Sequence, residues 1–369
     1  MTKALRLLVL SGVLVALGCA DAPPVGPEPG GEEVTIEEMR WHGHRTEPVK
    51  VLSRNMYIGF DVDETLLALA SGDPVVMQAA IEKALTTLTA TDIEIRAAAM
   101  AREVDLLRPD FLGLQEVSYI DVVIPGLADV HLDFLDILQQ KLAARQLNYV
   151  LAAQVFTTNV QLPPMGISLV DSDAMLINPK RVHVIGADAQ LYSENLGDVY
   201  GVGIDIVRGW TKVHARVRGA EVEVWNTHLE SGPEEFIVTL RGHQAGELAR
   251  LTSTDMPVFV MGDLNDELGS PMYDSLTTNG FDNVWQELRL WLPGYTCCHA
   301  PELWNPWPTF DERIDHVFVR GLPRVKGAIL RTGMWPWERV QGPYYKLWPS
   351  DHAGLFAALM VRGGLVVDD

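Results

Sequence analysis

The sequence predicts an α/β fold in which strands and helices form layers. Two observations support this prediction. From Val49 onward short apolar segments alternate with amphipathic ones, and the segments show no repeat of fixed period. At 369 residues and 47% apolar content, the chain is long enough to bury a large core without a disulfide scaffold.

The first 18 residues are typical of an export signal. Lys3 and Arg6 form a positive start, and the apolar run Leu7–Leu17 is too short to span a bilayer. Ala16-Leu17-Gly18-Cys19 resembles a bacterial lipobox, in which the cysteine is acylated after cleavage. We therefore expect secretion, lipidation of Cys19 and a membrane-anchored protein of the cell envelope, periplasmic or on the outer surface. The alternative is plain secretion with cleavage nearby.

Residues 19–47 are predicted to be a lipidated cysteine followed by a flexible tether. The segment has few apolar residues and is rich in proline and glycine, with Pro23, Pro24, Pro27, Pro29, Gly30 and Gly31. Such a composition cannot bury enough apolar surface to fold alone. The folded domain is expected over residues 48–363, and residues 364–369 are expected to form a short tail.

Strands and helices are expected to alternate along this domain. The predicted strands are Val49–Asn55, Phe111–Val117, Asp173–Asn178, Trp210–Val217, Val222–Leu229, Val258–Leu264, Ile314–Val319 and Gly354–Val361. Thr91 and Glu94 resemble a capping box that opens a helix ending before Pro109. Further helices are expected over Leu132–Ala144 and Pro233–Leu251.

Polar residues gather where these strands begin or end. They are Asn55, Glu116, Asn226 to His228, Asp263 to Asn265, Asp315 and Asp351. A single carboxylate after a strand is commonly a turn residue. An ordered set of carboxylates, amides and histidines instead favours a catalytic site, because the sheet fixes the backbone while the loop exposes the side chain.

The ordered set resembles the endonuclease/exonuclease/phosphatase superfamily. The segments that carry the resemblance are Ser53-Arg54-Asn55, Gln115-Glu116, Asn226-Thr227-His228-Leu229, Gly262-Asp263-Leu264-Asn265, Ile314-Asp315-His316 and Ser350-Asp351-His352. The superfamily includes deoxyribonucleases and bacterial sphingomyelinases. The resemblance implies a four-layer α/β sandwich of two packed mixed β-sheets flanked by helices, with the site at one edge.

Metal-assisted hydrolysis of a phosphate ester explains these residue types. Water attack builds negative charge on phosphoryl oxygens, so a hard divalent cation with oxygen ligands is the expected partner. Glu116 is the best candidate ligand, with Asn55 beside it, and the resemblance implies that Asp351 completes the shell. The expected ion is Mg²⁺, with Mn²⁺ or Ca²⁺ as alternatives.

Proton transfer near neutral pH favours histidine. The resemblance implies that His352 is an acid/base residue or transition-state stabiliser, oriented by Asp315 as in a catalytic triad. It implies a second catalytic histidine at His228, and a role for Asp263 and Asn265 in positioning water and binding phosphate oxygen. Whether Asp263 or a histidine removes the proton from water stays open.

Four further residues lie near these motifs in the sequence. Asp173 begins a predicted strand and is expected at the surface, the alternative being that it faces the site. Arg241 and Gln244 share a helix face, which we expect to be solvated rather than in contact with substrate. His316 follows Asp315 directly, so on a strand it points to the opposite face and is expected to be structural.

The adjacent residues Cys297 and Cys298 are expected to be two small buried or half-buried thiols, with a vicinal disulfide as the alternative outside the cytoplasm. Seven of the ten tryptophans lie at or beyond Trp285. They favour either contact with lipid or bases, or packing under long loops.

Charge bears on the substrate. The net charge is −20, and removal of the signal would make it −22, because Lys3 and Arg6 would be lost. No basic run of the kind that binds nucleic acid is present, although a local basic cleft is compatible with an acidic total.

The expected substrate is nucleic acid, a phospholipid or a small phosphodiester. The alternatives are a sphingomyelinase-like or phospholipase-like lipid hydrolase and a non-catalytic surface lipoprotein; no protein partner is expected.

Overall fold

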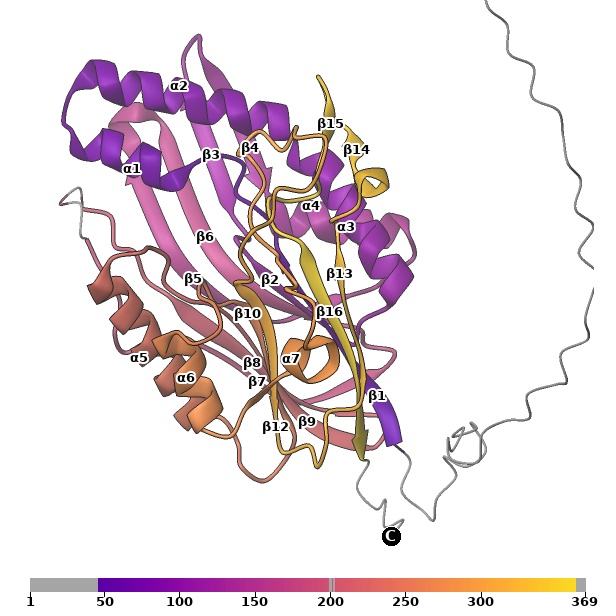
Figure 1. The fold of residues 1–369 in the computed structure, drawn as a ribbon. Coiled ribbons are helices and arrows are strands. Elements are labelled where there is room, and N and C mark those ends of the chain that lie inside the picture. Colours follow the sequence, from indigo (N-terminus) through magenta and orange to yellow (C-terminus); the bar gives the residue numbers. More distant parts are fainter. Residues whose placement is uncertain (1–45, 199–200, 202, 363–369) are drawn as a thin grey trace, which may run out of the picture. The chain divides into compact units, whose positions relative to one another are not determined.

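The structure, a computed structural model, describes residues 46–198, 201 and 203–362 (Figure 1). The predicted export signal, Cys19, most of the predicted tether and the predicted tail 364–369 lie outside the described residues. Strand β1 begins at Thr46, within the last residues assigned to the tether. Among the helices of the described part, none is both long and apolar enough to cross a bilayer.

One large sheet is built around the parallel pair β1 and β2. Its order is β13-β16-β1-β2-β6-β3-β4, with β5 also paired to β6, and its other pairings are antiparallel. The strands are β1 (Thr46–Asn55), β2 (Phe111–Gln115), β3 (Tyr119–Ile124), β4 (Ala128–Asp133), β5 (Val150–Leu162), β6 (Ile167–Ile177), β13 (Gly327–Thr332) and β16 (Gly354–Arg362).

The second large sheet has the order β11-β12-β10-β9-β8-β7, with β9 and β10 parallel. Its strands are β7 (Val182–Leu191), β8 (Gly209–Val217), β9 (Ala220–His228), β10 (Val258–Asp263), β11 (Asp282–Asn283) and β12 (Asp315–Arg320). A short ribbon pairs β14 (Val340–Gln341) with β15 (Lys346–Leu347).

Helices cover the outer faces of the two sheets, except α7 (Val284–Arg289), whose Val284 and Trp285 pack in the cluster between the sheets. The other helices are α1 (Val62–Ala70), α2 (Pro74–Thr91), α3 (Ile93–Leu107), α4 (Phe134–Ala144), α5 (Glu235–Leu251) and α6 (Pro271–Thr278), with short 3₁₀ turns at Pro163–Met165 and Pro336–Glu338. Figure 1 shows α3 and α4 on one side of the sheets and α5 and α6 on the other.

Alternation of side chains along the strands creates the layers. Val51 of β1 points between the sheets, where it packs in one cluster with Val224 of β9. Leu52, the next residue, points to the opposite face and joins the cluster that includes Met100 of α3. A third cluster joins α5 and α6 to the outer face of the second sheet. The predicted four-layer α/β sandwich of two mixed sheets is therefore confirmed.

The eight predicted strands and three predicted helices are all present, with small differences at their ends except in β6, which begins at Ile167 rather than at the predicted Asp173. One detail is wrong. The residue that caps α3 is Asp92, not Thr91, because the Asp92 side chain accepts the backbone N–H of Ile95. The structure also contains α1 and α2, which the sequence analysis did not anticipate.

Candidate active site

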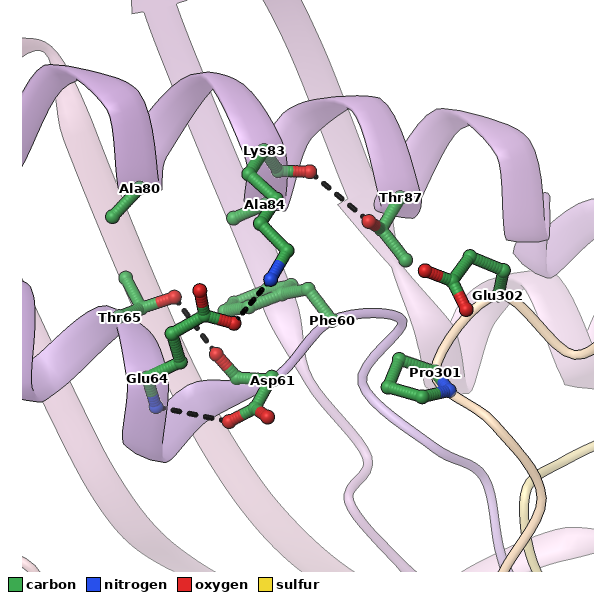
Figure 2. Close-up of a pocket in the computed structure, with 10 residues that line it drawn as sticks. All are labelled: Phe60, Asp61, Glu64, Thr65, Ala80, Lys83, Ala84, Thr87, Pro301 and Glu302. Atoms are coloured by element: carbon green, nitrogen blue, oxygen red, sulfur yellow. Dashed lines mark hydrogen bonds and ion pairs between the residues drawn. The ribbon is translucent and has the colours of Figure 1, made fainter.

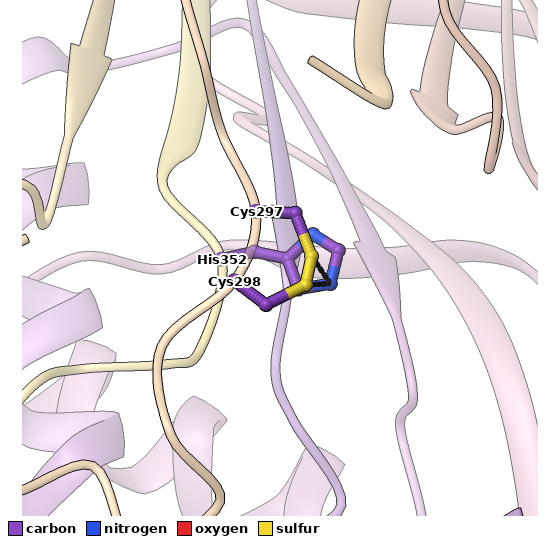
Figure 3. A group of neighbouring side chains, drawn as sticks. All are labelled: Cys297, Cys298 and His352. Atoms are coloured by element: carbon purple, nitrogen blue, oxygen red, sulfur yellow. Dashed lines mark hydrogen bonds between the residues drawn. A yellow bond between two sulfur atoms is a disulfide. The ribbon is translucent and has the colours of Figure 1, made fainter. Parts of the chain in front are cut away.

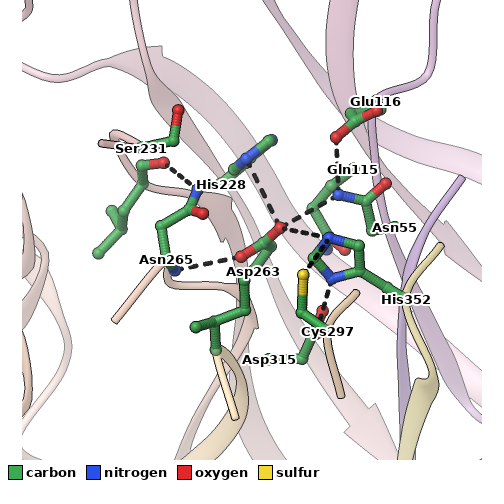
Figure 4. A network of polar contacts seen from close by, with 12 residues as sticks. Asn55, Gln115, Glu116, His228, Ser231, Asp263, Asn265, Cys297, Asp315 and His352 are labelled. Carbon is green, nitrogen blue, oxygen red and sulfur yellow. Dashed lines mark hydrogen bonds and ion pairs between the residues drawn. The ribbon is translucent and has the colours of Figure 1, made fainter. Parts of the chain in front are cut away.

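The polar residues predicted at strand ends meet at one edge of the two sheets (Figure 4). In the second sheet, His228 of β9 lies opposite Asp263 of β10, and Asp263 lies opposite Asp315 of β12. Residues directly opposite each other project from the same face of a sheet, so these three side chains point the same way. Asn55 ends β1 and Glu116 follows β2, so both come from the first sheet. The site is therefore built where the two sheets meet.

Three residues at the site have backbone conformations that most side chains avoid. Glu116 and Asn265 have φ angles of 55° and 53°, in the left-handed region. Such conformations cost of order 1 kcal/mol each and concentrate where a side chain must be aimed into a functional site. Gly262 has a φ of 153°, and a Cβ there would lie 1.9 Å from the carbonyl oxygen of Thr227. Only glycine therefore fits directly before Asp263.

Asp263 occupies the centre of the site. Its Oδ2 accepts a hydrogen bond from Nδ2 of Asn55 at 3.1 Å. The same oxygen lies 3.6 Å from Nε2 of His352 and 3.7 Å from Nε2 of His228. Its Oδ1 accepts the backbone N–H of Asn265 at 3.1 Å. Burial raises the pKa of Asp263 to about 7, against the opposing charge of His352, so this carboxyl group can exchange a proton near neutral pH.

His352 and Asp315 form the pair that the sequence predicted. Nδ1 of His352 lies 2.9 Å from Oδ2 of Asp315, and both side chains are buried. Burial by itself would lower the pKa of His352, but the negative charges of Asp315, Asp263 and Asp351 outweigh it and raise the pKa well above its ordinary value. His352 is therefore positively charged at neutral pH.

His228 lies on the other side of Asp263 and has different surroundings. Its Nδ1 is buried and has no hydrogen-bond partner among the described residues. Burial lowers the pKa of His228 well below its ordinary value, and the positive charges of Arg208 and His352 lower it further. His228 is therefore a neutral imidazole at neutral pH.

The predicted metal ligands lie on the side of the site formed by β1 and β2. Nδ2 of Asn55 donates to Oε1 of Glu116 at 2.8 Å, and the backbone N–H of Ile58 donates to Oε2 at 2.7 Å. The side-chain oxygen of Asn55 accepts the backbone N–H of Tyr57 at 2.8 Å. In this arrangement the amide nitrogen of Asn55, rather than its oxygen, faces the carboxylates.

The residues on this side fit a hard divalent cation. Burial raises the pKa of Glu116, and the negative charge of Asp351 raises it further. Burial also raises the pKa of Asp351. A bound cation would offset the cost of ionising both carboxylates at this depth. Glu116 and Asp351 would hold such an ion, and waters would complete its shell, since Mg²⁺ keeps several waters when it binds to proteins.

Buried polar side chains behind the site hold its backbone in place. The guanidinium of Arg96 donates to four carbonyl oxygens, those of Met56, Tyr57, Thr91 and Pro349. Asn226 of β9 reaches the first sheet, where its Nδ2 donates to the carbonyl oxygens of Leu114 and Ala174. Nε2 of Gln115 donates to Oδ1 of the same Asn226. These bonds tie the two sheets and the loops of the site together.

Two expectations about neighbouring residues were wrong. Asp173 is buried, not at the surface, and neither of its carboxylate oxygens has a hydrogen-bond partner among the described residues. Arg241 and Gln244 are also buried rather than solvated. Arg241 donates to the carbonyl oxygens of Glu230 and Gly232, and Gln244 accepts the backbone N–H of Glu230. Both residues therefore hold the loop that follows His228.

His316 lies on the face of β12 opposite Asp315, as its position predicted. Its Nδ1 pairs with Nδ2 of Asn283 at 3.0 Å, and its Nε2 lies 2.9 Å from the carbonyl oxygen of Asp266. The ring is buried. These contacts bind it into the second sheet and keep it out of the site.

Two charged residues near the site were missed in the sequence. Arg208 pairs with Glu230, with Nε and Oε1 3.1 Å apart, and its charge acts on His228. Asp171 accepts a hydrogen bond from Oγ of Ser118 at 2.6 Å, and burial raises its pKa to about 6. Arg208 lies in a loop with no pattern of its own, so no sequence signal could have identified it.

Cys297 and Cys298 lie directly beside His352 (Figure 3). Their sulfur atoms are joined as a vicinal disulfide, so the expectation of two separate thiols is wrong. Sγ of Cys297 is 3.6 Å and Sγ of Cys298 is 3.9 Å from Nε2 of His352. No sequence pattern linked these cysteines to the histidine, because the contact spans more than fifty residues of chain.

A separate pocket lies between α1 and α2 (Figure 2). Lys83 forms an ion pair there with Glu64. Asp61 caps α1 by accepting the backbone N–H of Glu64. The lining contains no histidine and none of the predicted catalytic residues, so the chemistry is assigned to the strand ends.

Solved structures share this fold. An endonuclease/exonuclease/phosphatase from Beutenbergia cavernae is 21% identical with a TM-score of 0.55, over 87% of this chain and 73% of that one. A family protein from Bacteroides thetaiotaomicron is 18% identical with a TM-score of 0.52, over 86% and 99%. TDP2 of D. rerio, complexed with single strand DNA product, is 16% identical with a TM-score of 0.51, over 85% and 98%.

No curated protein matches the sequence. Residues 88–352, most of the chain, match the Endonuclease/Exonuclease/phosphatase family. The match includes Glu116, both histidines, Asp263 and Asp315. The two mixed sheets and the site at their edge agree with this match. The chain therefore belongs to the endonuclease/exonuclease/phosphatase family.

Proposed function

We propose that this protein is a secreted, lipid-anchored hydrolase of phosphate esters, most of all phosphodiesters, that depends on a divalent metal ion. The observation that carries the proposal is the position of Asp263 between two histidines, with its Oδ2 3.6 Å from Nε2 of His352 and 3.7 Å from Nε2 of His228. Hydrolysis of a phosphodiester needs one group that accepts a proton from water and one that stabilises or protonates the leaving oxygen. This arrangement provides both.

Each residue has a defined task in this proposal. His352, kept positively charged by the neighbouring carboxylates, donates a hydrogen bond or a proton to the phosphoryl group. Asp315 fixes its tautomer and orientation. Two groups are able to accept the proton of water, Asp263 with a pKa of about 7 and the neutral His228. Asn55 positions Asp263 through its side-chain Nδ2, and Asn265 positions it through its backbone N–H. Glu116 and Asp351 would hold the metal ion, which would supply positive charge to stabilise the phosphoryl oxygens.

Three classes of substrate are candidates: nucleic acid, small phosphodiesters and lipids. The D. rerio TDP2 structure contains single strand DNA product, which places nucleic acid among the candidates. Against this, the chain carries a net charge of −20, and the arginines behind the site, Arg54 and Arg96, are buried and bonded to protein groups. An acidic surface repels a phosphate backbone. Small phosphodiesters therefore fit better than DNA.

A lipid substrate is the third candidate. Among the described residues, five tryptophans of the carboxyl-terminal third have side chains that are about half exposed or more: Trp291, Trp304, Trp307, Trp335 and Trp337. Trp335 and Trp337 stack on each other with their ring centres 5.0 Å apart. Exposed tryptophans of this kind suit a membrane interface. A sphingomyelinase-like or phospholipase-like activity would use that contact, and an anchor at Cys19 would keep the enzyme at the membrane.

The test of function is hydrolysis by the purified protein of DNA, sphingomyelin, phosphatidylinositol phosphates and a chromogenic phosphodiester. At least one substrate should be hydrolysed with Mg²⁺ or Mn²⁺, and a chelator should abolish turnover. Glu116→Gln should cut the rate by about 10²-fold or more, since it removes a ligand charge while keeping the shape. Glu82→Gln, on the exposed face of α2, serves as the matched control and should leave the rate unchanged. Activity that survives the chelator undiminished would contradict the proposal.

The anchor has its own test. Cys19→Ser should move the protein from the membrane fraction to the soluble fraction without changing its turnover. Sedimentation of the variant with membranes as complete as that of the parent would show that Cys19 carries no anchor.

A further inference from the structure

The cysteine pair beside His352 has no task in hydrolysis. Cys297 is buried, whereas Cys298 is exposed and gives solvent access to the pair. Both sulfur atoms lie within 4 Å of Nε2 of His352, at 3.6 and 3.9 Å. The three ligand atoms lie within 4.8 Å of one another. We propose that, once reduced, Cys297 and Cys298 form with His352 a site for a thiophilic divalent cation such as Zn²⁺.

The distances from the two sulfurs to Nε2 match tetrahedral zinc. With Zn–S bonds of about 2.3 Å and Zn–N bonds of about 2.0 Å, a sulfur and a nitrogen at a tetrahedral angle are about 3.5 Å apart. The observed separations of 3.6 and 3.9 Å between the sulfurs and Nε2 are close to this value. The two sulfurs, bonded to each other in the structure, would have to move apart to about 3.8 Å after reduction. Two sulfurs and one imidazole nitrogen would leave the fourth position to water.

Asp315 prepares His352 for this role. A histidine that binds a metal through one ring nitrogen usually donates the proton of the other to a carboxylate. Nδ1 of His352 lies 2.9 Å from Oδ2 of Asp315, so Nδ1 keeps its proton while zinc displaces the proton from Nε2, the nitrogen that lies beside the sulfurs. The contact with Asp315 that orients the His352 ring for hydrolysis therefore also orients it to bind zinc.

The two metal positions select different ions. Glu116 and Asp351 offer carboxylate oxygens, which suit Mg²⁺ and Mn²⁺, whereas thiolates and imidazole suit Zn²⁺. Zinc on Nε2 of His352 removes that nitrogen from proton transfer. The ion would therefore inhibit hydrolysis, a consequence that rests on the proposed function.

Redox state controls whether the site exists. In the structure the two sulfurs are bonded to each other, and a bonded pair cannot supply two thiolates. A dithiol reductant transfers two electrons and two protons to the disulfide, which yields two thiols, while the reductant becomes a disulfide. Zinc binding then releases two protons from the thiols and one from Nε2 of His352. The oxidised protein should be indifferent to zinc and the reduced protein sensitive to it.

Binding is measured first, by equilibrium dialysis of the full chain against Zn²⁺ in excess Mg²⁺, with and without prior reduction. The reduced protein should bind one Zn²⁺ more than the oxidised protein. Cd²⁺ in place of Zn²⁺ should give a thiolate charge-transfer absorption. Cys298→Ser, at the exposed position, should weaken binding by more than about tenfold, the smallest effect expected even for losing an outer-shell partner. Cys19→Ser, the remaining cysteine, is the matched control and should bind as the parent does.

Inhibition is measured second, relative to the rate of each protein without zinc. Zinc should slow the reduced parent at least about tenfold more than the reduced Cys298→Ser variant, which has lost a ligand. Equal zinc binding by reduced and oxidised protein, or by parent and Cys298→Ser, would overturn the proposal. If no substrate is hydrolysed, the proposed function fails, while the binding result still decides whether the zinc site exists.

Discussion

The two histidines of the active site have opposite electrostatic surroundings, although their Nε2 atoms lie at almost equal distances from the same oxygen of Asp263. His352 is paired with Asp315 and lies near two further carboxylates, which keep it protonated. His228 has no partner for its Nδ1 among the described residues and lies near Arg208, which keeps it neutral. Two histidines on either side of the Asp263 carboxylate therefore differ in charge.

This difference shows how the fold assigns an acid and a base. Groups whose pKa values are pushed apart by their surroundings can act as proton donor and proton acceptor at the same pH. For His352 the push comes from Asp315, Asp263 and Asp351, the first two placed side by side by strand register, and for His228 it comes from burial and from Arg208. The roles of the two histidines follow from the charged groups that lie beside each one.

Truncation of either histidine should produce the largest effect. His352→Ala and His228→Ala should each lower kcat by about 10²-fold or more, the usual scale for losing acid/base help. Melting temperatures should show that both variants fold. His243→Ala, on the exposed face of α5, is the control and should keep full activity. Unchanged rates in both variants would place the active site elsewhere.

Loss of Arg96 should have a smaller effect, which is on the stability of the fold. Arg96 connects the two sides of the site. Its guanidinium bonds both the loop after β1 and the carbonyl of Pro349, which precedes the Asp351-His352 segment. Arg96→Met should destabilise the fold by about 3 kcal/mol, because the carbonyl oxygens lose their donor while buried. Arg102→Met, exposed on the same helix, should cost much less. Equal denaturant midpoints for the two variants would show that Arg96 is not a structural anchor.

The charge difference itself can be read by NMR titration of histidine-labelled, metal-free protein. His352 should keep its proton above the ordinary histidine pKa of about 6.5, and His228 should stay neutral well below it. With a raised folded pKa, His352 stabilises the fold below about pH 6.5 and loses that contribution as the pH rises through its folded pKa. With a depressed folded pKa, His228 costs stability as the pH falls below about 6.5. If both rings titrate with a pKa near 6.5, the two histidines do not differ in charge and the account is contradicted.

The strands, the two-sheet fold and the residues that meet at the site were predictable from the sequence. Strand ends such as Asn55 and Asp263 carry a local signal, since an apolar run stops at a polar residue. Their order along the chain also matched a known pattern. The position of His316 followed from the two-residue period of a strand, which places it opposite Asp315.

What the sequence could not supply were contacts that depend on the folded chain. Arg208 and the cysteine pair approach the histidines from loops, where no periodicity fixes the direction of a side chain. Arg241 and Gln244 were expected in solvent because their helix is polar, yet the loop after β9 covers them and uses their hydrogen bonds. The sequence of a helix does not indicate that a loop will cover it.

The most direct test of the account is a double-mutant cycle on Asp315 and His352, measured as kcat on any accepted substrate. The account holds that Asp315 acts through His352, with the two side chains 2.9 Å apart. Asp315→Asn should therefore lower kcat by permitting the wrong tautomer, and the double variant with His352→Ala should be hardly slower than His352→Ala alone. Fully additive losses would contradict the account, because they would mean that the two residues do not work as a pair.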